Sequence, residues 1–244
     1  MIPEPAPAAA ISPARPPTVA RMFGRIAPRY DLLNTLMTFG LDAGWRRRAV
    51  AAAALRPDGR ALDVGTGTGA LALALARAAP RAQVIGVDFA PAMVVRAPAR
   101  VARAGVAAHA WFAQADALRL PFPDASFDCV TSAFVMRNVA DLGQAFREQA
   151  RVLRPGGRVV CVELTRPRQP VFRHLFAWYF HRWVPLLGAV VAGDAAAYTY
   201  LPESVDRFPA PSALTDVMRE AGLRAVRHEL LGLGTVSLHV GHAR

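Results

Sequence analysis

The chain has 244 residues, which is enough for one domain with a substantial buried core. Arg, His or Pro interrupts every apolar run, which argues against a membrane span, and the first residues lack the pattern of a signal peptide. We therefore expect a cytoplasmic protein. The formal net charge is +11, but every basic residue is Arg in a sequence rich in Ala, Gly and Pro, so the charge indicates little about partners.

The first 57 residues contain a tail rich in Pro and Ala and a helical segment. Residues 1–17 are rich in Pro and Ala and lack periodicity, which is typical of a disordered tail. Residues 18–57 have a helical pattern and are expected to form an N-terminal helical cap. Within it, Asp42 is expected to cap a helix that ends before Pro57.

From Arg60 onward, short apolar strands alternate with helices. Strands are predicted at 61–64, 83–87, 108–113, 127–135 and 158–164, and helices at 70–78, 91–104 and 141–153. Such alternation predicts a parallel sheet covered by helices on both faces. The two cysteines, Cys129 and Cys161, fall in these apolar runs, which predicts buried free thiols and neither a disulfide nor a metal site.

The C-terminal third departs from this alternation. Residues 167–210 are aromatic and apolar with scattered Arg and His, and we interpret them as an insertion. Ser212 is expected to cap a helix that ends at Ala221, and two last strands are predicted to pair through the turn at 232–234. The predicted fold is a single Rossmann-like α/β domain over 18–244, with a seven-stranded, mostly parallel sheet and a C-terminal antiparallel hairpin strand.

A glycine-rich turn joins the first predicted strand to the helix after it. Residues 63–69 read Asp-Val-Gly-Thr-Gly-Thr-Gly. Gly65 and Gly67 let the backbone turn sharply and approach a ligand, and the helix N-terminus adds amide donors. The spacing G-x-G-x-G differs from the G-x-G-x-x-G of dinucleotide binders, which disfavours a dehydrogenase. An acidic residue in this turn would repel a pyrophosphate but is acceptable for a ligand with a methionyl group in its place. Asp63 is then expected to meet the ammonium group of that ligand, directly or through water.

Acidic residues stand at the ends of the next two strands. Asp88 is placed to accept hydrogen bonds from both hydroxyls of a ribose. Asp116 is placed to accept one from an adenine amino group, with Ala117 offering its backbone amide and Met93 packing on the adenine face. A lone Asp at a strand end is usually a turn or a helix cap, but three at successive strand ends indicate a ligand site. The combination resembles class I methyltransferases and implies S-adenosyl-L-methionine, converted to S-adenosyl-L-homocysteine, with no metal.

Further motifs flank this central half. The most specific are Tyr-Asp-x-x-Asn at 30–34, Arg-Asn-Val at 137–139 and Tyr-x-Tyr-Leu-x-Glu-Ser at 198–204. Together they resemble the quinone-biosynthesis C-methyltransferases, which methylate a polyprenyl-substituted hydroquinone ring, over nearly the whole chain after the tail. The resemblance implies that Thr68, with Asp88, Asp116 and Ala117, contacts the cofactor. It departs at Ala133, where members often carry a serine, and at Asp116, which is often asparagine.

The resemblance leaves the acceptor open. Residues 162–167 and 172–173 are closer to the menaquinone branch, so demethylmenaquinol is the favoured acceptor. The alternatives are a benzoquinol precursor of ubiquinone, another small molecule, or a non-catalytic module that binds S-adenosylmethionine or lipid. A nucleic-acid substrate is not expected, because the Asn/Asp-Pro-Pro-Tyr/Phe motif of base-amino methyltransferases is replaced by Ala-Phe-Val-Met-Arg at 133–137.

Carbon methylation of a hydroquinone needs a ring that has lost a phenolic proton and lies in line with the sulfonium methyl group. We expect Arg137 to stabilise the phenolate or to orient a water that accepts its proton, since Arg itself is a poor base. Asn138 is expected to hold the second ring oxygen, and Tyr30 to close over cofactor and ring. The alternative for Arg137 is a surface salt bridge or a contact at a helix end. His174 and His181 are weaker candidates for a base.

The insertion carries the remaining open question. Residues 171–191 are rich in aromatic side chains and contain two Arg, which suits peripheral contact with a lipid interface at the inner membrane face. A polyprenyl substrate needs such a route. The alternatives are a lid over the site or the interface of a homodimer.

Overall fold

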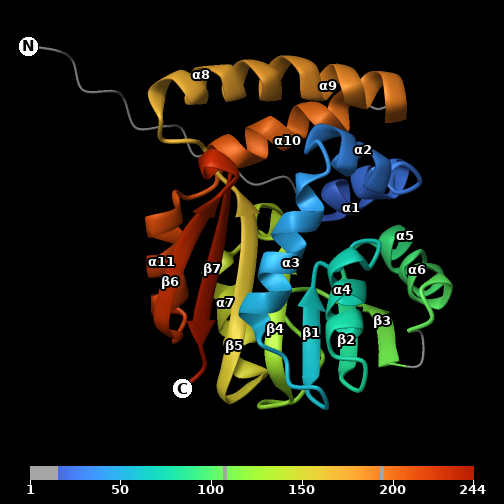
Figure 1. Ribbon diagram of the computed structural model, residues 1–244, viewed down its shortest axis with the longest axis vertical. Helices are drawn as coiled ribbons and strands as arrows, with labels where there is room; N and C mark the ends of the chain where they lie inside the picture. The colour runs from blue at the N-terminus through green and yellow to red at the C-terminus, as the bar shows by residue number, and fades with distance from the viewer. Residues whose placement is uncertain (1–15, 107–108, 193–194) are drawn as a thin grey trace, which may run out of the picture.

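The computed structural model describes residues 16–106, 109–192 and 195–244. Its centre is one seven-stranded sheet with the strand order β3-β2-β1-β4-β5-β7-β6 (Figure 1). The strands are β1 (Arg60–Val64), β2 (Gln83–Asp88), β3 (Ala110–Gln114), β4 (Phe127–Ala133), β5 (Leu153–Leu164), β6 (Arg224–Leu231) and β7 (Val236–His242). The five neighbouring strands β3, β2, β1, β4 and β5 pair in parallel, and β7 pairs antiparallel with β5 and β6. The predicted fold class is confirmed.

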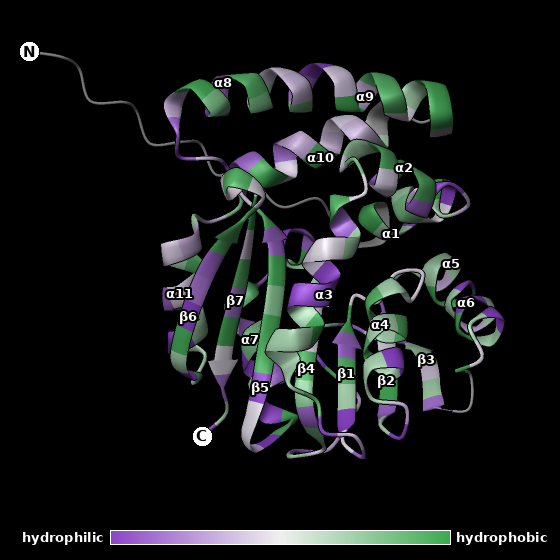
Figure 2. Cartoon of the chain, in the orientation of Figure 1, coloured by the Kyte–Doolittle hydropathy of each residue, from purple (hydrophilic) through white to green (hydrophobic). Residues whose placement is uncertain are grey.

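Helices cover both faces of this sheet. The helices α3 (Leu41–Ala53), α4 (Ala70–Ala78) and α6 (Ala97–Arg103) pack on one face, and α7 (Leu142–Arg151) and α11 (Pro211–Glu220) on the other. The central strands are apolar toward both layers, as the green colouring in Figure 2 shows. Cys129 faces the first layer and Cys161 the second, and both thiols are buried and free, as predicted.

The sheet places the glycine-rich turn at its switch point. β2 and β3 lie on one side of β1, whereas β4 and β5 lie on the other. In open α/β sheets a ligand crevice forms beyond the carboxyl ends of the strands at such a reversal. The turn follows β1, so it stands at the mouth of this crevice.

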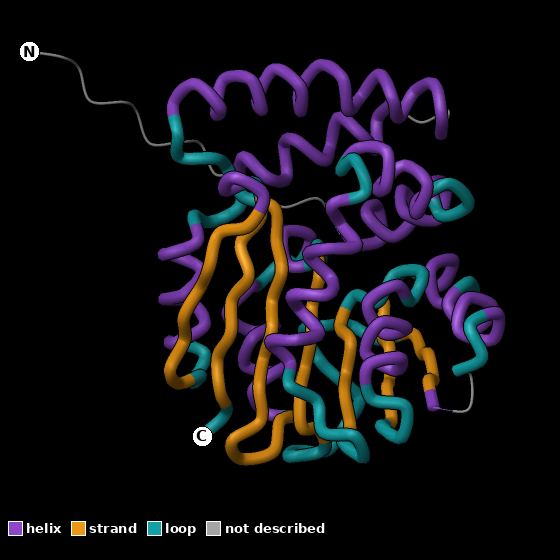
Figure 3. The backbone as a smooth tube through the Cα atoms, in the orientation of Figure 1, coloured by secondary structure: helices purple, strands orange, loops and turns teal. Residues whose placement is uncertain are grey.

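A second layer of helices lies across the carboxyl ends of the strands (Figures 1 and 3). It consists of α1 (Pro16–Ile26), α2 (Tyr30–Met37), α8 (Pro170–Trp178), η3 (Tyr179–Trp183), α9 (Val184–Leu187), η4 (Gly188–Ala192) and α10 (Ala195–Arg207). The N-terminal segment and the insertion share one apolar cluster, which includes Leu33, Phe180 and Val184. The insertion therefore roofs the sheet edge that carries the predicted site. None of the described helices is long and apolar enough to cross a membrane.

Three predicted helix boundaries need correction. The single helix expected at 91–104 is divided into α5 (Pro91–Val94) and α6, because Pro98 lacks an N–H and occupies the first turn of a new helix. Asp42 does not cap α3, which begins after Gly40. Its carboxylate instead accepts from Thr38 Oγ1 at 3.2 Å and Arg46 Nη2 at 2.5 Å. Ser212 is not a cap, since α11 begins at Pro211 after Ala210.

Other boundaries shift by a few residues. Most of the predicted tail, 1–15, lies outside the described residues, and α1 already begins at Pro16. Part of the third strand, 107–108, also lies outside them, and β3 begins at Ala110. β4 ends two residues early, at Ala133, while β5 begins before the Pro-Gly-Gly turn. The hairpin between β6 and β7 turns through η5 (Gly232–Gly234), as predicted.

Candidate functional site

Two cavities meet at the carboxyl edge of the sheet. The first, of about 850 Å³ with its open mouth included, lies beyond β1, β2 and β4. Its wall includes Gly65, Gly67, Asp88, Met93, Asp116, Ala117 and Asn138. Six of the eight expected cofactor-binding residues thus surround one space, although they come from four separate segments of the chain.

The glycine-rich turn forms the floor of this first cavity. Gly65 and Gly67 adopt left-handed φ angles of 68° and 54°, which favour glycine. A Cβ on Gly65 would stand 2.3 Å from Cγ2 of Val135, so a side chain is excluded there by the wall itself. A Cβ on Gly67 would meet its nearest described atom, Cε1 of Tyr30, only at 3.9 Å and would fill the cavity instead. The turn is therefore a cradle that a ligand can approach along its backbone.

Asp88 joins this turn to the end of β2. Its Oδ2 accepts from the N–H of Gly67 and its Oδ1 from the N–H of Ala90, each at 2.8 Å. Burial raises the pKa of this carboxyl group, and the two backbone N–H groups act against that rise. Each carboxylate oxygen keeps a further lone pair, so Asp88 can hold the turn and still accept hydrogen bonds from a ligand.

Asp63 and Thr68 lie behind the turn. Asp63 is buried, and its two oxygens accept from Oγ1 of Thr66 and Oγ1 of Thr131, each at 2.8 Å. Thr68 is also buried, and its Oγ1 donates to Asp31 of α2 at 2.8 Å. Neither side chain lines the first cavity, and both are hydrogen-bonded to neighbouring side chains, so the structure shows no direct access from the cavity to Asp63 or Thr68. Both position the turn.

Asp63 should make stability depend on pH. Burial raises the pKa of this carboxyl group to about 6, above its value in the unfolded chain. Between these two values the folded state holds more protons, so the contribution of Asp63 to stability falls as the pH rises from about 4 to about 6. Asn at this position stays neutral and can still pair with both Thr hydroxyls. We expect the free energy of unfolding of Asp63→Asn, relative to that of the native protein, to rise by about 2 kcal/mol from pH 4 to pH 8.

Denaturant unfolding of both proteins across this pH range measures the gain. Asp58→Asn, at an exposed position, is the matched control. A difference between Asp63→Asn and the native protein that stays constant with pH would contradict a raised Asp63 pKa.

The three residues expected to contact an adenine all line the first cavity. Asp116 lies on the wall, where its Oδ1 accepts from the N–H of Leu118 at 2.9 Å. This hydrogen bond orients the carboxylate of Asp116 in the loop after β3. Ala117 follows on the same wall, and Met93 contributes a side chain that is buried against α1 and α2. These three residues are close enough to contact one planar ligand group.

The second cavity, of about 660 Å³ with its mouth included, lies between α2, α3 and the insertion. Tyr30 and Phe134 line both cavities, so the two spaces adjoin at these rings. Most of its wall is apolar or aromatic and includes Phe176, Tyr179 and Phe180 of the insertion. Sequence reasoning did not find this cavity, since its wall is assembled from elements far apart in the chain.

Arg137 stands at the inner end of the second cavity, in η2 (Met136–Asn138) after β4. Its Nη1 donates to the carbonyl of Phe134 at 2.5 Å and to Oε2 of Glu163 at 3.0 Å. The Arg137 side chain is 6% exposed and that of Glu163 is fully buried. The alternative interpretation of Arg137 as a surface salt bridge is therefore wrong. Among the described residues, Nε of Arg137 has no hydrogen-bond partner although it is buried.

Glu163 was missed as a site residue. Glu163 lies near the end of the apolar strand β5. An acidic residue in such an apolar run is the sequence signal by which this site residue could have been found. Burial raises the pKa of its carboxyl group, while the guanidinium of Arg137 opposes that rise. Glu163 therefore anchors Arg137 and offsets its charge.

Tyr30 and Asn138 flank Arg137 at the junction of the two cavities. Tyr30 is hydrogen-bonded to Asn34, and burial raises its phenol pKa, against the opposing charge of Arg137. Asn138 lines the first cavity, and its Oδ1 accepts from the hydroxyl of Tyr200 at 3.1 Å. The expected catalytic residues are thus brought together, with Asn138 on the cofactor side.

The other candidates of the insertion lie elsewhere. His174 is exposed on α8 and bonds the carbonyl of Pro170, and His181 is exposed and pairs with Asp206 at 3.2 Å. Neither is placed to act as a base. Tyr198 is buried against Gly188, where any Cβ would stand 2.2 Å from its ring. This contact pins α10 to the rest of the insertion.

The comparisons with known proteins agree with this geometry. The model of the ubiE/COQ5 methyltransferase family matches residues 12–243. The chain belongs to this family. It is 50% identical to a demethylmenaquinone methyltransferase of Thermus thermophilus, over 90% of this chain and 99% of that protein. It is 41% identical to a ubiquinone/menaquinone biosynthesis C-methyltransferase UbiE of Desulfotalea psychrophila, over 92% of this chain and 90% of that one.

Solved structures agree on the fold. The [4+2]-cyclase SpnF matches with a TM-score of 0.72 at 18% identity, over 96% of this chain and 97% of that one. A SAM-dependent methyltransferase of Thermotoga maritima, described as a possible histamine N-methyltransferase, matches at 0.63 and 20% identity, over 93% and 100%. This member of the ubiE/COQ5 family is accordingly a methyltransferase with a class I fold, and S-adenosylmethionine is its methyl donor.

Proposed function

We propose that the chain methylates a ring carbon of a polyprenyl hydroquinone and converts demethylmenaquinol to menaquinol. One observation carries the proposal. An apolar, aromatic cavity with a buried Arg137–Glu163 pair at its inner end adjoins the glycine-lined cavity at Tyr30 and Phe134. This arrangement suits a flat ring whose oxygen needs a positive charge and whose tail needs an apolar wall.

We assign the first cavity to the methyl donor, which leaves as S-adenosyl-L-homocysteine. When bound, S-adenosylmethionine supplies a methyl group from its sulfonium. The backbone of Gly65 and Gly67 gives it room, and Asp88 accepts from the ribose hydroxyls. Asp116 and the N–H of Ala117 bind the adenine edge, and Met93 packs on its face. Asp63 and Thr68 keep the turn in this shape.

The second cavity holds the quinol ring. Loss of a phenolic proton to water makes the ring carbon electron-rich, and the guanidinium of Arg137 stabilises the phenolate. Its Nε is buried and has no hydrogen-bond partner among the described residues, so the charge of the guanidinium, and not a direct bond from Nε, acts on that oxygen. Tyr30 separates the two cavities and orients the ring, and Asn138 supports the second ring oxygen from the donor side.

The names of the relatives support demethylmenaquinol as the acceptor. Four relatives at 44–50% identity are named demethylmenaquinone methyltransferase, whereas those at 38–41% are named ubiquinone/menaquinone biosynthesis C-methyltransferase. The second group favours a benzoquinol precursor of ubiquinone as the second candidate acceptor.

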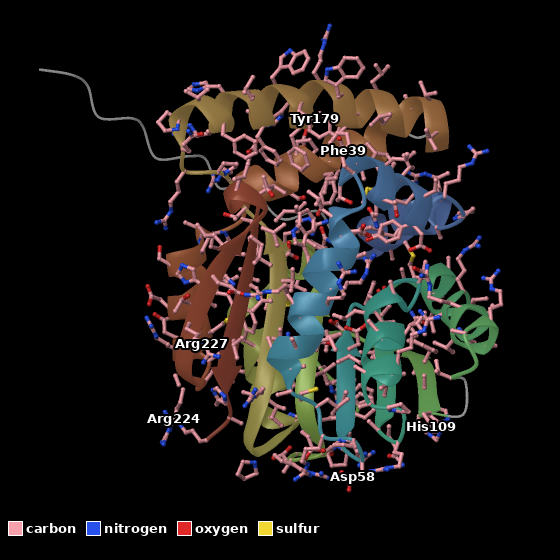
Figure 4. The ribbon with its side chains drawn as sticks, in the orientation of Figure 1. Phe39, Asp58, His109, Tyr179, Arg224 and Arg227 are labelled. Atoms are coloured by element: carbon pink, nitrogen blue, oxygen red, sulfur yellow. The ribbon has the colours of Figure 1, made fainter. Side chains whose placement is uncertain are left out.

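A transfer assay tests the proposal. The protein is incubated with S-adenosylmethionine and each demethyl quinol under reducing conditions, and the products are weighed by mass spectrometry. We expect demethylmenaquinol to gain one methyl group faster than the benzoquinol. Asp88→Ala should raise the KM for the donor at least tenfold, roughly the loss of two charged hydrogen bonds. Asp58→Ala, at the far end of the sheet (Figure 4), should leave it unchanged.

The assay also separates the alternatives. Faster methylation of the benzoquinol would move the chain to the ubiquinone branch. Donor binding in calorimetry without transfer to either quinol would overturn the proposal and favour a different acceptor or a non-catalytic module.

A further inference from the structure

We propose that the outer face of the insertion binds an anionic lipid surface, from which the polyprenyl quinol reaches the second cavity. The outer face is defined by Val171, Leu175, Trp178, Trp183, Leu186 and Val190 of α8, η3, α9 and η4. Lipid binding stands on the surface alone, and only the entry of the quinol rests on the proposed function.

The outer face is unusually apolar for an exposed helix. All six of its side chains are large and at least 44% exposed, with Trp178 at 60% and Trp183 at 44%. Figure 2 shows green and purple alternating along this helical run at the top of the molecule, away from the sheet. Large exposed apolar patches mark contacts with proteins or membranes. Tryptophan is the side chain typical of the boundary between water and lipid.

The π-turn of η3 helps to gather the two tryptophans. In an uninterrupted α-helix, residues five positions apart point about 140° away from each other. A π-turn bonds residues five apart and rotates less per residue, which brings Trp183 back toward Trp178. Their rings lie 6.0 Å apart in an edge-to-face arrangement. The wide turn thus builds one aromatic pair on the exposed side.

The charge of residues 164–192 indicates which partner suits the outer face. Residues 164–192 contain four Arg and two His but no Asp or Glu. Arg173 and Arg182 are exposed on α8 and η3, in the same helical run as the outer face. A second copy docked by a two-fold axis would place this cationic segment against itself, and residues 164–192 offer no carboxylate to meet it. An anionic headgroup layer supplies the missing negative charge along with apolar depth.

The inner face of the same helices leads to the second cavity. Phe176, Tyr179 and Phe180 line that cavity. The hydroxyl of Tyr179 donates to the carbonyl of Met37 at 3.0 Å, and its ring lies 5.8 Å from that of Phe39, which is 78% exposed. Figure 4 shows Tyr179 and Phe39 beside each other beneath the insertion. One helical run therefore offers one side to lipid and the other to the place where the ring is methylated.

Vesicle co-sedimentation of the full chain tests the inference without substrate. The probes are vesicles of phosphatidylglycerol and phosphatidylcholine in equal amounts, and vesicles of phosphatidylcholine alone. We expect binding to the anionic vesicles that weakens at high salt. The variants Trp178→Ser/Trp183→Ser and Arg173→Gln/Arg182→Gln should each lower the affinity by about tenfold or more.

Matched controls place the same changes elsewhere. Trp111→Ser removes a tryptophan that is 48% exposed on β3, and Arg224→Gln/Arg227→Gln removes two exposed Arg from β6, far from the insertion (Figure 4). Both controls should bind as the native protein does. The thermal midpoint of each variant verifies folding, since all the changed side chains are exposed.

Several outcomes would overturn the inference. They are absence of vesicle binding, equal affinity for both kinds of vesicle, and equal losses in the outer-face variants and their controls. A dimer that dissociates in Trp178→Ser/Trp183→Ser, without vesicle binding, would assign the face to a second copy. Vesicle binding without quinol methylation would instead refute the proposed function and leave the lipid surface standing.

Discussion

Replacing Arg137 with methionine is expected to lower kcat by about 10²–10³, with the KM for S-adenosylmethionine nearly unchanged. Methionine keeps much of the volume of the side chain but removes the charge at the inner end of the second cavity. In the proposed mechanism the phenolate then loses the charge of Arg137, whereas Arg46, the other arginine described on the wall of this cavity, is paired with Asp42. Single-turnover rates with a demethyl quinol measure the loss directly.

Stability complicates this single change. Glu163 is fully buried, and without Arg137 its charge has no counterpart. Removing one partner of a buried pair typically costs about 3–5 kcal/mol, because the other charge stays uncompensated. Arg137→Met is therefore expected to unfold at lower denaturant concentration as well as to turn over slowly.

A double variant separates the two effects. In Arg137→Met/Glu163→Gln neither member of the buried pair is charged, so most of the lost stability should return while kcat stays low. Arg48→Met, which opens the exposed pair between Arg48 and Glu229, is the control and should cost about 1 kcal/mol or less. A double variant that recovers kcat together with stability would show that Arg137 acts only through the fold.

Features encoded over short stretches were predictable from the sequence. The strand–turn–helix around Gly65 and Gly67 and the acids at the ends of β1 to β3 all follow from local pattern and turn chemistry. The parallel order then brings those strand ends together. Six of the eight expected donor-binding residues accordingly lie on one cavity wall.

The remaining features depend on partners far along the chain. Asp63 does not line the first cavity, and its carboxylate is hydrogen-bonded to Thr131, its neighbour on β4. Arg137 pairs with Glu163, which lies on β5, 26 residues later in the chain. No local pattern specifies such pairs, since the parallel register between β1, β4 and β5 creates them.

The insertion shows a different limit. Its π-turns interrupt the 3.6-residue period, so the hydrophobic pattern of 171–191 does not reveal which side faces the protein. The structure resolves this by placing Phe176 and Phe180 inward and Trp178 and Trp183 outward. A lid over the site and the proposed lipid contact would use opposite sides of one helical run, so the two roles are compatible with each other.

The second large effect is expected at the glycine-rich turn. Gly65→Ala forces a left-handed φ of 68° on a residue with a Cβ, which costs about 1–2 kcal/mol. The new Cβ also stands 2.3–2.7 Å from three side-chain atoms of Val135, and such overpacking costs about 1–3 kcal/mol more. Val135 lies two residues before Arg137, so the displacement reaches both cavities. We expect a loss of about 2–5 kcal/mol in stability and at least tenfold weaker donor binding, roughly the effect of a shift near 1 Å.

Two further alanine variants divide this effect into its causes. Gly156→Ala has a φ of 76°, and the structure describes no heavy atom within 4 Å of its new Cβ, so it should show the backbone cost alone. Gly67→Ala should match Gly156→Ala in stability, because its Cβ meets only open cavity, yet weaken donor binding as Gly65→Ala does. Denaturant unfolding and calorimetry with S-adenosylmethionine measure both quantities. If Gly67→Ala bound the donor as tightly as Gly156→Ala, the cradle would have to lie elsewhere, because a methyl group in the assigned donor cavity must collide with its occupant.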